Sequence, residues 1–79
     1  MRILDNDADV KLDAISLFLT KTEALHLIGY LEQLVESTRH DHSHLMSEDY
    51  QKEITICLYD SENIKNFEPR IQKLIKIDE

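Results

Sequence analysis

Three of the four histidines in this 79-residue chain lie at alternate positions within one short segment. The segment reads Arg39-His40-Asp41-His42-Ser43-His44. In extended backbone, side chains two residues apart point in the same direction and are separated by about 6.5–7 Å. Imidazole rings bind transition metals, exchange protons near neutral pH and donate hydrogen bonds to phosphates. This segment is therefore the strongest candidate in the chain for a ligand-binding site.

The first interpretation of the segment is a contact surface for a protein or for a small anionic nucleotide. Arg39 and Lys52 bracket the histidines, and we expect these two cations to pair with acidic groups of the ligand. The imidazoles would donate hydrogen bonds, and Tyr50 would stack on a base or a ribose. The predicted contact residues are Arg39, His40, His42, His44, Tyr50 and Lys52.

The alternative interpretation is a zinc-type metal site. Two imidazoles at this spacing can chelate a transition metal, and a third imidazole with a carboxylate completes a tetrahedron. The residues that would form this site are His40, His42, His44 and Asp49. No cysteine pair and no His-Glu-x-x-His sequence accompanies them. A third interpretation, a solvated polar connection, also stays open.

Composition narrows the class of protein. The net charge is −7, from sixteen acidic and nine basic residues. This balance argues against binding of nucleic acid polymers, which requires a basic surface, and against docking on anionic lipid. Cys57 is the only cysteine, so no internal disulfide can form, and a reducing cytoplasm fits best. No apolar run reaches the length of a membrane span.

Enzyme interpretations receive little support from the sequence. Gly29 is the only glycine, so the chain has no glycine-rich phosphate loop. A catalytic pocket in so short a chain would have to form between subunits. We therefore expect a cytoplasmic protein that is not an enzyme.

Hydrophobic periodicity predicts an α+β fold with the element order β-β-α-β-α in a single domain, residues 1–79. Apolar alternation predicts strands over residues 11–19 and 53–59, and a short first strand is expected over residues 2–4. Residues 37–51 are polar and are expected to form a loop that holds the histidines. We expect two helices to cover one face of a small, mainly antiparallel sheet.

The helices carry local signals at their ends. The segment Thr20-Lys21-Thr22-Glu23 fits a capping box, and the helix that follows is expected to run to about Ser37. Its apolar residues form one stripe at 3.6-residue spacing: Ala24, Leu27, Ile28, Leu31, Leu34 and Val35. Asn66 is expected to cap the second helix, with Pro69 in the first turn.

One face of the predicted sheet is left uncovered by these elements. It carries Phe18, Thr55, Cys57 and Tyr59. A chain of this length buries only a modest core, and an uncovered apolar face is most simply covered by a second copy. The sequence therefore predicts a homo-oligomer.

The layout of the chain resembles that of small bacterial and phage-borne proteins of no assigned activity. The resemblance covers most of the chain and lies in residues 17–24 (LFLTKTEA), 31–34 (LEQL) and 49–56 (DYQKEITI), with the histidine segment before the last run. In size and charge the chain is also similar to immunity proteins and to phage inhibitors of bacterial defence. This similarity implies a non-enzymatic protein that sequesters or blocks a target.

Overall fold

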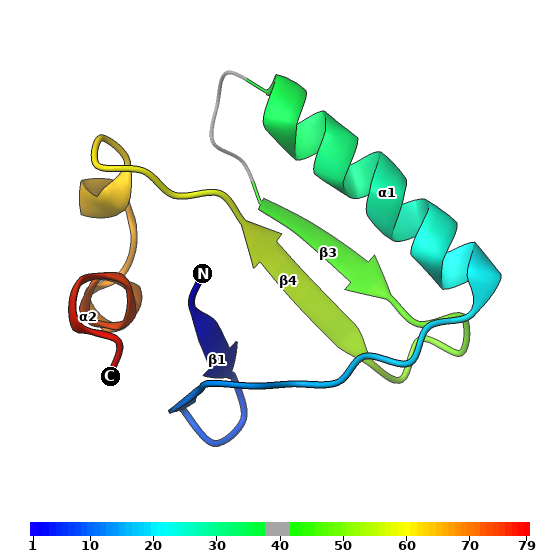
Figure 1. The fold of residues 1–79 in the computed structure, drawn as a ribbon, viewed down its shortest axis with the longest axis horizontal. Coiled ribbons are helices and arrows are strands. Elements are labelled where there is room, and N and C mark those ends of the chain that lie inside the picture. Colours follow the sequence, from blue (N-terminus) through cyan, green and yellow to red (C-terminus); the bar gives the residue numbers. More distant parts are fainter. Residues whose placement is uncertain (38–41) are drawn as a thin grey trace. The chain divides into compact units, whose positions relative to one another are not determined.

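The computed structural model describes residues 1–37 and 42–79. Its elements are, in chain order, strands β1 (Ile3–Asp5) and β2 (Val10–Leu12), helix α1 (Lys21–Glu36), strands β3 (His42–Met46) and β4 (Glu53–Cys57), the 3-10 helix η1 (Ile64–Asn66) and helix α2 (Pro69–Ile77) (Figure 1). The strands form two antiparallel sheets, β1–β2 and β3–β4. The α+β class is confirmed, and the predicted order fits the structure with β3 as a further strand. In the described part of the chain, the strands form two separate sheets rather than the single sheet predicted, because β1 pairs with β2 and β3 pairs with β4.

The described residues form two compact units. One unit comprises Met1–Leu17 and Asp60–Glu79, and the other comprises Phe18–Tyr59. The first unit contains the β1–β2 sheet, η1 and α2. The second contains α1 and the β3–β4 sheet, and it carries the histidines.

Helix α1 begins with the predicted capping box. The Thr20 hydroxyl accepts a hydrogen bond from the Glu23 N–H at 3.1 Å, and Glu23 Oε1 accepts one from the Thr20 N–H at 2.9 Å. Glu23 Oε2 also accepts a hydrogen bond from the Glu48 N–H at 2.8 Å. These bonds, those from Thr20 first, lower the pKa of the Glu23 carboxyl. Glu23 therefore ties the start of α1 to the turn that follows β3.

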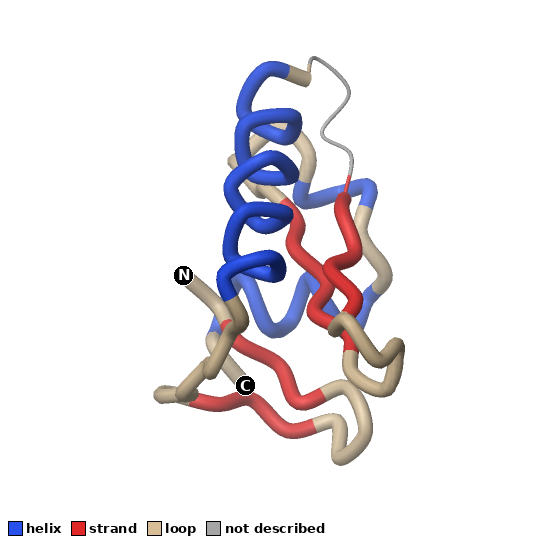
Figure 2. Tube along the Cα trace, turned by 90° about the vertical axis from the view of Figure 1, so that its right-hand side faces the viewer, coloured by secondary structure: helices blue, strands red, loops and turns tan. Residues whose placement is uncertain are grey.

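The core of this unit lies between α1 and β3, which pack against each other. Figure 2 shows the helix running alongside the β3–β4 hairpin. Leu34 from the helix and Leu45 from the strand are each only 3% exposed. In the register of the hairpin, Leu45 is paired with Ile54, so the sheet face that bears these two residues is the inner face.

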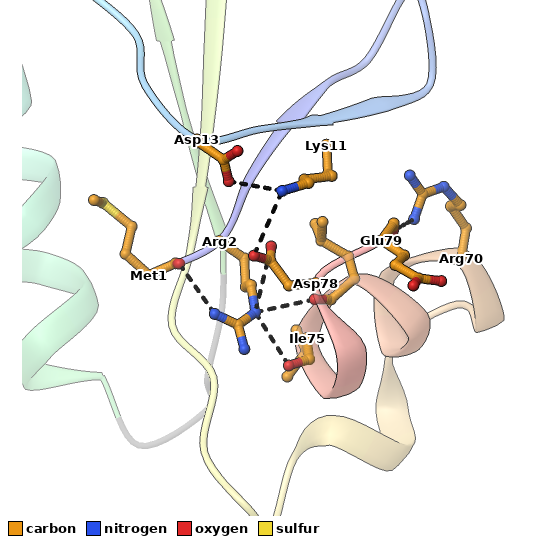
Figure 3. Close-up of polar contacts among 9 residues, drawn as sticks. Met1, Arg2, Lys11, Asp13, Arg70, Ile75, Asp78 and Glu79 are labelled. Carbon is orange, nitrogen blue, oxygen red and sulfur yellow. Dashed lines mark hydrogen bonds and ion pairs between the residues drawn. The ribbon is translucent and has the colours of Figure 1, made fainter.

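The other unit joins a β-hairpin to the C-terminal helix through arginine contacts (Figure 3). Arg2 Nε donates to the carbonyl groups of Leu74 and Ile75, at 3.0 and 3.2 Å. Arg70 Nε donates to Asp9 Oδ1 at 2.7 Å. Leu74 and Ile75 are themselves buried and form the core of this unit. The guanidinium of Arg2 thus reaches the Ile75 carbonyl in the last turn of α2, and it shares the Leu74 carbonyl with the N–H of Asp78.

The predicted strand over residues 11–19 is wrong beyond Leu12. Strand β2 covers only Val10–Leu12, because its partner β1 offers three residues, with Ile3 opposite Leu12 and Asp5 opposite Val10. Alternation alone does not make a strand where no neighbour supplies hydrogen bonds. Phe18 consequently lies in an exposed connection rather than on a sheet face.

The predicted polar loop over residues 37–51 is also wrong in part, because His42–Met46 form β3. These residues form a strand because Leu45 is buried in the core and because β4 pairs with the backbone of β3. The remaining polar residues, 47–52, form the turn to β4. Predicted site residues Arg39 and His40 lie outside the described residues.

The start of the last helix differs from the prediction as well. Asn66 ends the short helix η1, and Glu68 occupies the N-cap of α2. Pro69 is the first residue of α2, as predicted, because proline lacks the N–H that the first turn would leave unpaired.

Candidate functional site

Two described histidines, His42 and His44, stand on an exposed sheet face, whereas His26 lies in α1. The register pairs His42 with Cys57, His44 with Thr55, and Met46 with Glu53, and paired residues share a face. These six residues, the outer face of the β3–β4 hairpin, lie opposite the inner face that packs on α1. All are exposed except Met46, which is half-buried. The predicted alternation in β4, with Thr55 and Cys57 on one side and Ile54 and Ile56 on the other, is confirmed.

His44 is fixed in place by two neighbours on β4. Its Nδ1 contacts Glu53 Oε1 directly and lies 3.0 Å from Thr55 Oγ1. The Thr55 hydroxyl lies 3.5 Å from the same carboxylate oxygen, to which it donates. The His42 ring meets the His44 ring edge to face, with 4.8 Å between the ring centroids. Two imidazoles, a carboxylate and a hydroxyl are thus gathered on one open surface.

Cys57 occupies the end of this surface, opposite His42. Partial burial raises the pKa of the Cys57 thiol. At neutral pH the side chain is therefore a thiol rather than a thiolate, and the thiolate is the nucleophilic form. Cys57 fits a weakly polar contact residue better than a reactive one.

The turn between β3 and β4 is organised around Ser47. Its hydroxyl oxygen accepts hydrogen bonds from the N–H groups of Gln51 and Lys52, at 3.2 and 3.0 Å, and its hydroxyl donates to Asp49. The bond from Ser47 lowers the pKa of the Asp49 carboxyl. Tyr50 sits at the tip with a φ of 58° and is 77% exposed. A left-handed backbone is unusual for so bulky a residue, so the turn presents Tyr50 at a cost in stability.

The structure brings together only part of each predicted residue set. His42 and His44 are in contact, and Tyr50 and Lys52 lie in the adjoining turn. Asp49 belongs to that turn and lies beyond the far end of β3 from His42, a strand length of about 13 Å. Among residues 1–37 and 42–79, no three His, Cys, Asp or Glu side chains are grouped so that they could hold a metal ion.

Sequence reasoning missed the two residues that hold His44. Glu53 and Thr55 come nine and eleven positions after His44, and only the strand register joins them to it. A signal was nevertheless present. The histidines alternate at period two, as do Glu53, Thr55 and Cys57, so two strands with polar outer faces could have been paired.

No family model, curated protein or solved structure matches the chain. The interpretation of the outer face therefore depends on its own geometry. Within the part of the chain that the structure describes, no helix combines the length and the apolar character needed to cross a membrane.

Proposed function

We propose that this chain is a non-enzymatic binding protein that acts by occupying a site on a protein target, in the manner of an immunity or anti-defence protein. Its contact surface comprises the outer face together with Tyr50 and Lys52, and the sequence adds Arg39 and His40. The observation that carries this proposal is the fixed position of His44, held by Glu53 and Thr55 on an exposed sheet face.

Preorganisation supports a binding role for this surface. Side chains that are already ordered lose less conformational entropy when a partner docks, so more of the interaction energy appears as affinity. Because Nδ1 of His44 is engaged by its neighbours, Nε2 is the atom that would meet the target. The Glu53 carboxylate and the Thr55 hydroxyl oxygen add acceptors beside it.

Charge favours a protein target over a nucleotide. The carboxylate of Glu53 stands next to His44, where it would repel a phosphate, and the whole chain carries a net charge of −7. A protein target with a basic surface would instead be attracted by this negative charge, and long-range attraction speeds association. We place the protein in the cytoplasm, where the exposed thiol of Cys57 stays reduced.

The test compares the target captured by three forms of the full chain. The His42→Ala/His44→Ala variant removes both rings from exposed positions, and Lys73→Ala/Lys76→Ala, on the exposed side of α2, serves as the matched control. We expect a protein that wild type and control retain and the histidine variant loses. After purification, that protein should bind the histidine variant at least about tenfold more weakly, which corresponds to about 1.4 kcal/mol. Equal binding to all three forms, or no retained protein, would overturn the proposal.

Thermal unfolding tests whether the chain binds zinc or a nucleotide instead of a protein target. Zinc bound by the predicted set His40, His42, His44 and Asp49 would stabilise the chain by about 2.7 kcal/mol at a concentration one hundred times the dissociation constant, and a bound nucleotide would do the same. We expect neither to raise the melting temperature. A rise with zinc that chelator reverses and the histidine variant lacks would replace our proposal with a metal-binding domain. A rise with nucleotide would replace it with nucleotide sequestration.

A further inference from the structure

Helix α1 has more apolar surface than β3 covers. Leu34 faces the core, whereas Ile28, Leu31 and Val35 are 53, 40 and 73% exposed. These three residues follow the spacing i, i+3 and i+7, which places them on one side of the helix. We call them the α1 stripe. Its length and regular spacing are those of a surface that packs against another helix.

Charged residues are unevenly placed beside the α1 stripe. At 100° per residue, Lys21, Glu32 and Glu36 follow one another along the same flank, and all three are exposed. The cation stands at the start of the helix and the carboxylates near its end. Both placements oppose the helix macrodipole, which favours anions at the N-terminus and cations at the C-terminus. The charges on this flank are therefore unfavourable in an isolated helix. They are complementary to the same flank of a second helix that runs in the opposite direction.

We propose that the α1 stripe docks on the α1 stripe of a second copy of this chain, with the two helices antiparallel about a twofold axis. Centred between Ile28 and Leu31, this pairing sets each Ile28 against Leu31 of the second copy. It also brings each Lys21 within about 3 Å, along the helix axis, of Glu36 of the second copy. In a parallel pair, Lys21 of one copy would lie level with Lys21 of the other along the helix axis and far from Glu36. Only the antiparallel pair compensates both unfavourable charges.

This dimer is independent of the proposed target-binding function and is compatible with it. The α1 helix packs on the inner face of the hairpin, whereas His42, His44 and Thr55 stand on the outer face. Docking through the α1 stripe therefore leaves both outer faces of the dimer open. A twofold interface of this kind is self-complementary and closed, so it stops at two copies.

The test measures the mass of the full chain by sedimentation as a function of concentration. We expect wild type to form a dimer and Val35→Glu to remain a monomer with an unchanged circular dichroism spectrum. Lys21→Glu should weaken the dimer about five- to tenfold, because two symmetry-related pairs are lost. The Lys21→Glu/Glu36→Lys variant should restore it. Lys73→Glu makes the same change in charge on α2 and should have no effect.

Four results would overturn the proposal. The first is a wild-type chain that stays monomeric at the highest attainable concentration. The second is a dimer that Val35→Glu leaves intact, since it would then form through another surface. The third is a Val35→Glu variant that lowers the melting temperature of a monomeric chain, because the α1 stripe would then be covered within one chain. Failure of the double variant to recover what Lys21→Glu loses would exclude the antiparallel pairing.

Discussion

Leu34 and Val35 are neighbours in α1, and both belong to the apolar stripe that the sequence predicts, yet the structure buries only one of them. Leu34 is 3% exposed and Val35 is 73% exposed. Truncating each to alanine removes apolar carbons from the same helix at adjacent positions. The two variants therefore form a matched pair that tests which side of α1 packs on β3.

The expected costs in free energy of unfolding differ by about sixfold or more. Leu34→Ala loses the burial of its side chain and leaves a cavity between α1 and β3, and such changes cost about 3 kcal/mol. For a chain of this size, this cost lowers the melting temperature by about 12–24 °C. Val35→Ala removes an exposed side chain and introduces the best helix former, so the free energy of unfolding should change by less than about 0.5 kcal/mol.

Urea unfolding at low protein concentration, monitored by circular dichroism, measures the change in the free energy of unfolding for both variants. Low concentration matters because a dimer through the α1 stripe would add a concentration-dependent contribution from Val35. The two variants should have similar urea slopes and clearly different midpoints. Equal midpoints, or a larger loss with Val35→Ala, would refute the packing of α1 that we describe.

Three further substitutions test other parts of the account. Glu23→Gln should lower the stability of the chain at neutral pH and make that stability fall less in acid. The pKa of Glu23 is depressed in the folded chain, so the stabilisation by its carboxylate is present above the ordinary pKa of 4.5 and is lost as the pH drops through the folded pKa. A pH series of melting temperatures measures this difference. Gly29→Ala should raise the free energy of unfolding by about 0.5–1 kcal/mol, because the added Cβ meets no atom within 4 Å. A lower free energy of unfolding, measured by urea denaturation, would contradict the open space around Gly29. Tyr50→Gly should relieve the left-handed backbone and raise the melting temperature, yet weaken capture of the target; equal or stronger capture would remove Tyr50 from the contact surface.

Local signals were sufficient to predict α1 and β4. The capping box of Thr20 and Glu23 marks the start of the helix, and 3.6-residue periodicity carries it to Glu36. The alternation over residues 53–59 predicts β4 with the correct faces, although the structure ends the strand at Cys57. In each case the pattern lies within the element itself, so no knowledge of neighbouring elements was needed.

Non-local pairing explains the elements that the sequence did not predict. Strand β3 contains two histidines and a serine, which are not among the residues enriched in strands. It forms because β4 pairs with it and α1 buries Leu45. The alternation over residues 11–19 indicated a strand, but only Val10–Leu12 finds a partner.

The same limit applies to the candidate site. The spacing of His42 and His44 predicted that their rings share one side, and the structure places them in contact. The contacts of His44 with Glu53 and Thr55 depend on the hairpin register, which a single sequence does not specify. The polar pattern on both strands becomes informative only once they are paired.

Site-specific photocrosslinking in living cells tests the central claim, that the outer face contacts a protein target, most directly. A photoreactive residue replaces Thr55, at the middle of the outer face, or, as the control, Lys73 on the exposed side of α2. We predict a discrete protein adduct from position 55 and none from position 73. No adduct from position 55, or the same adducts from both positions, would contradict the account.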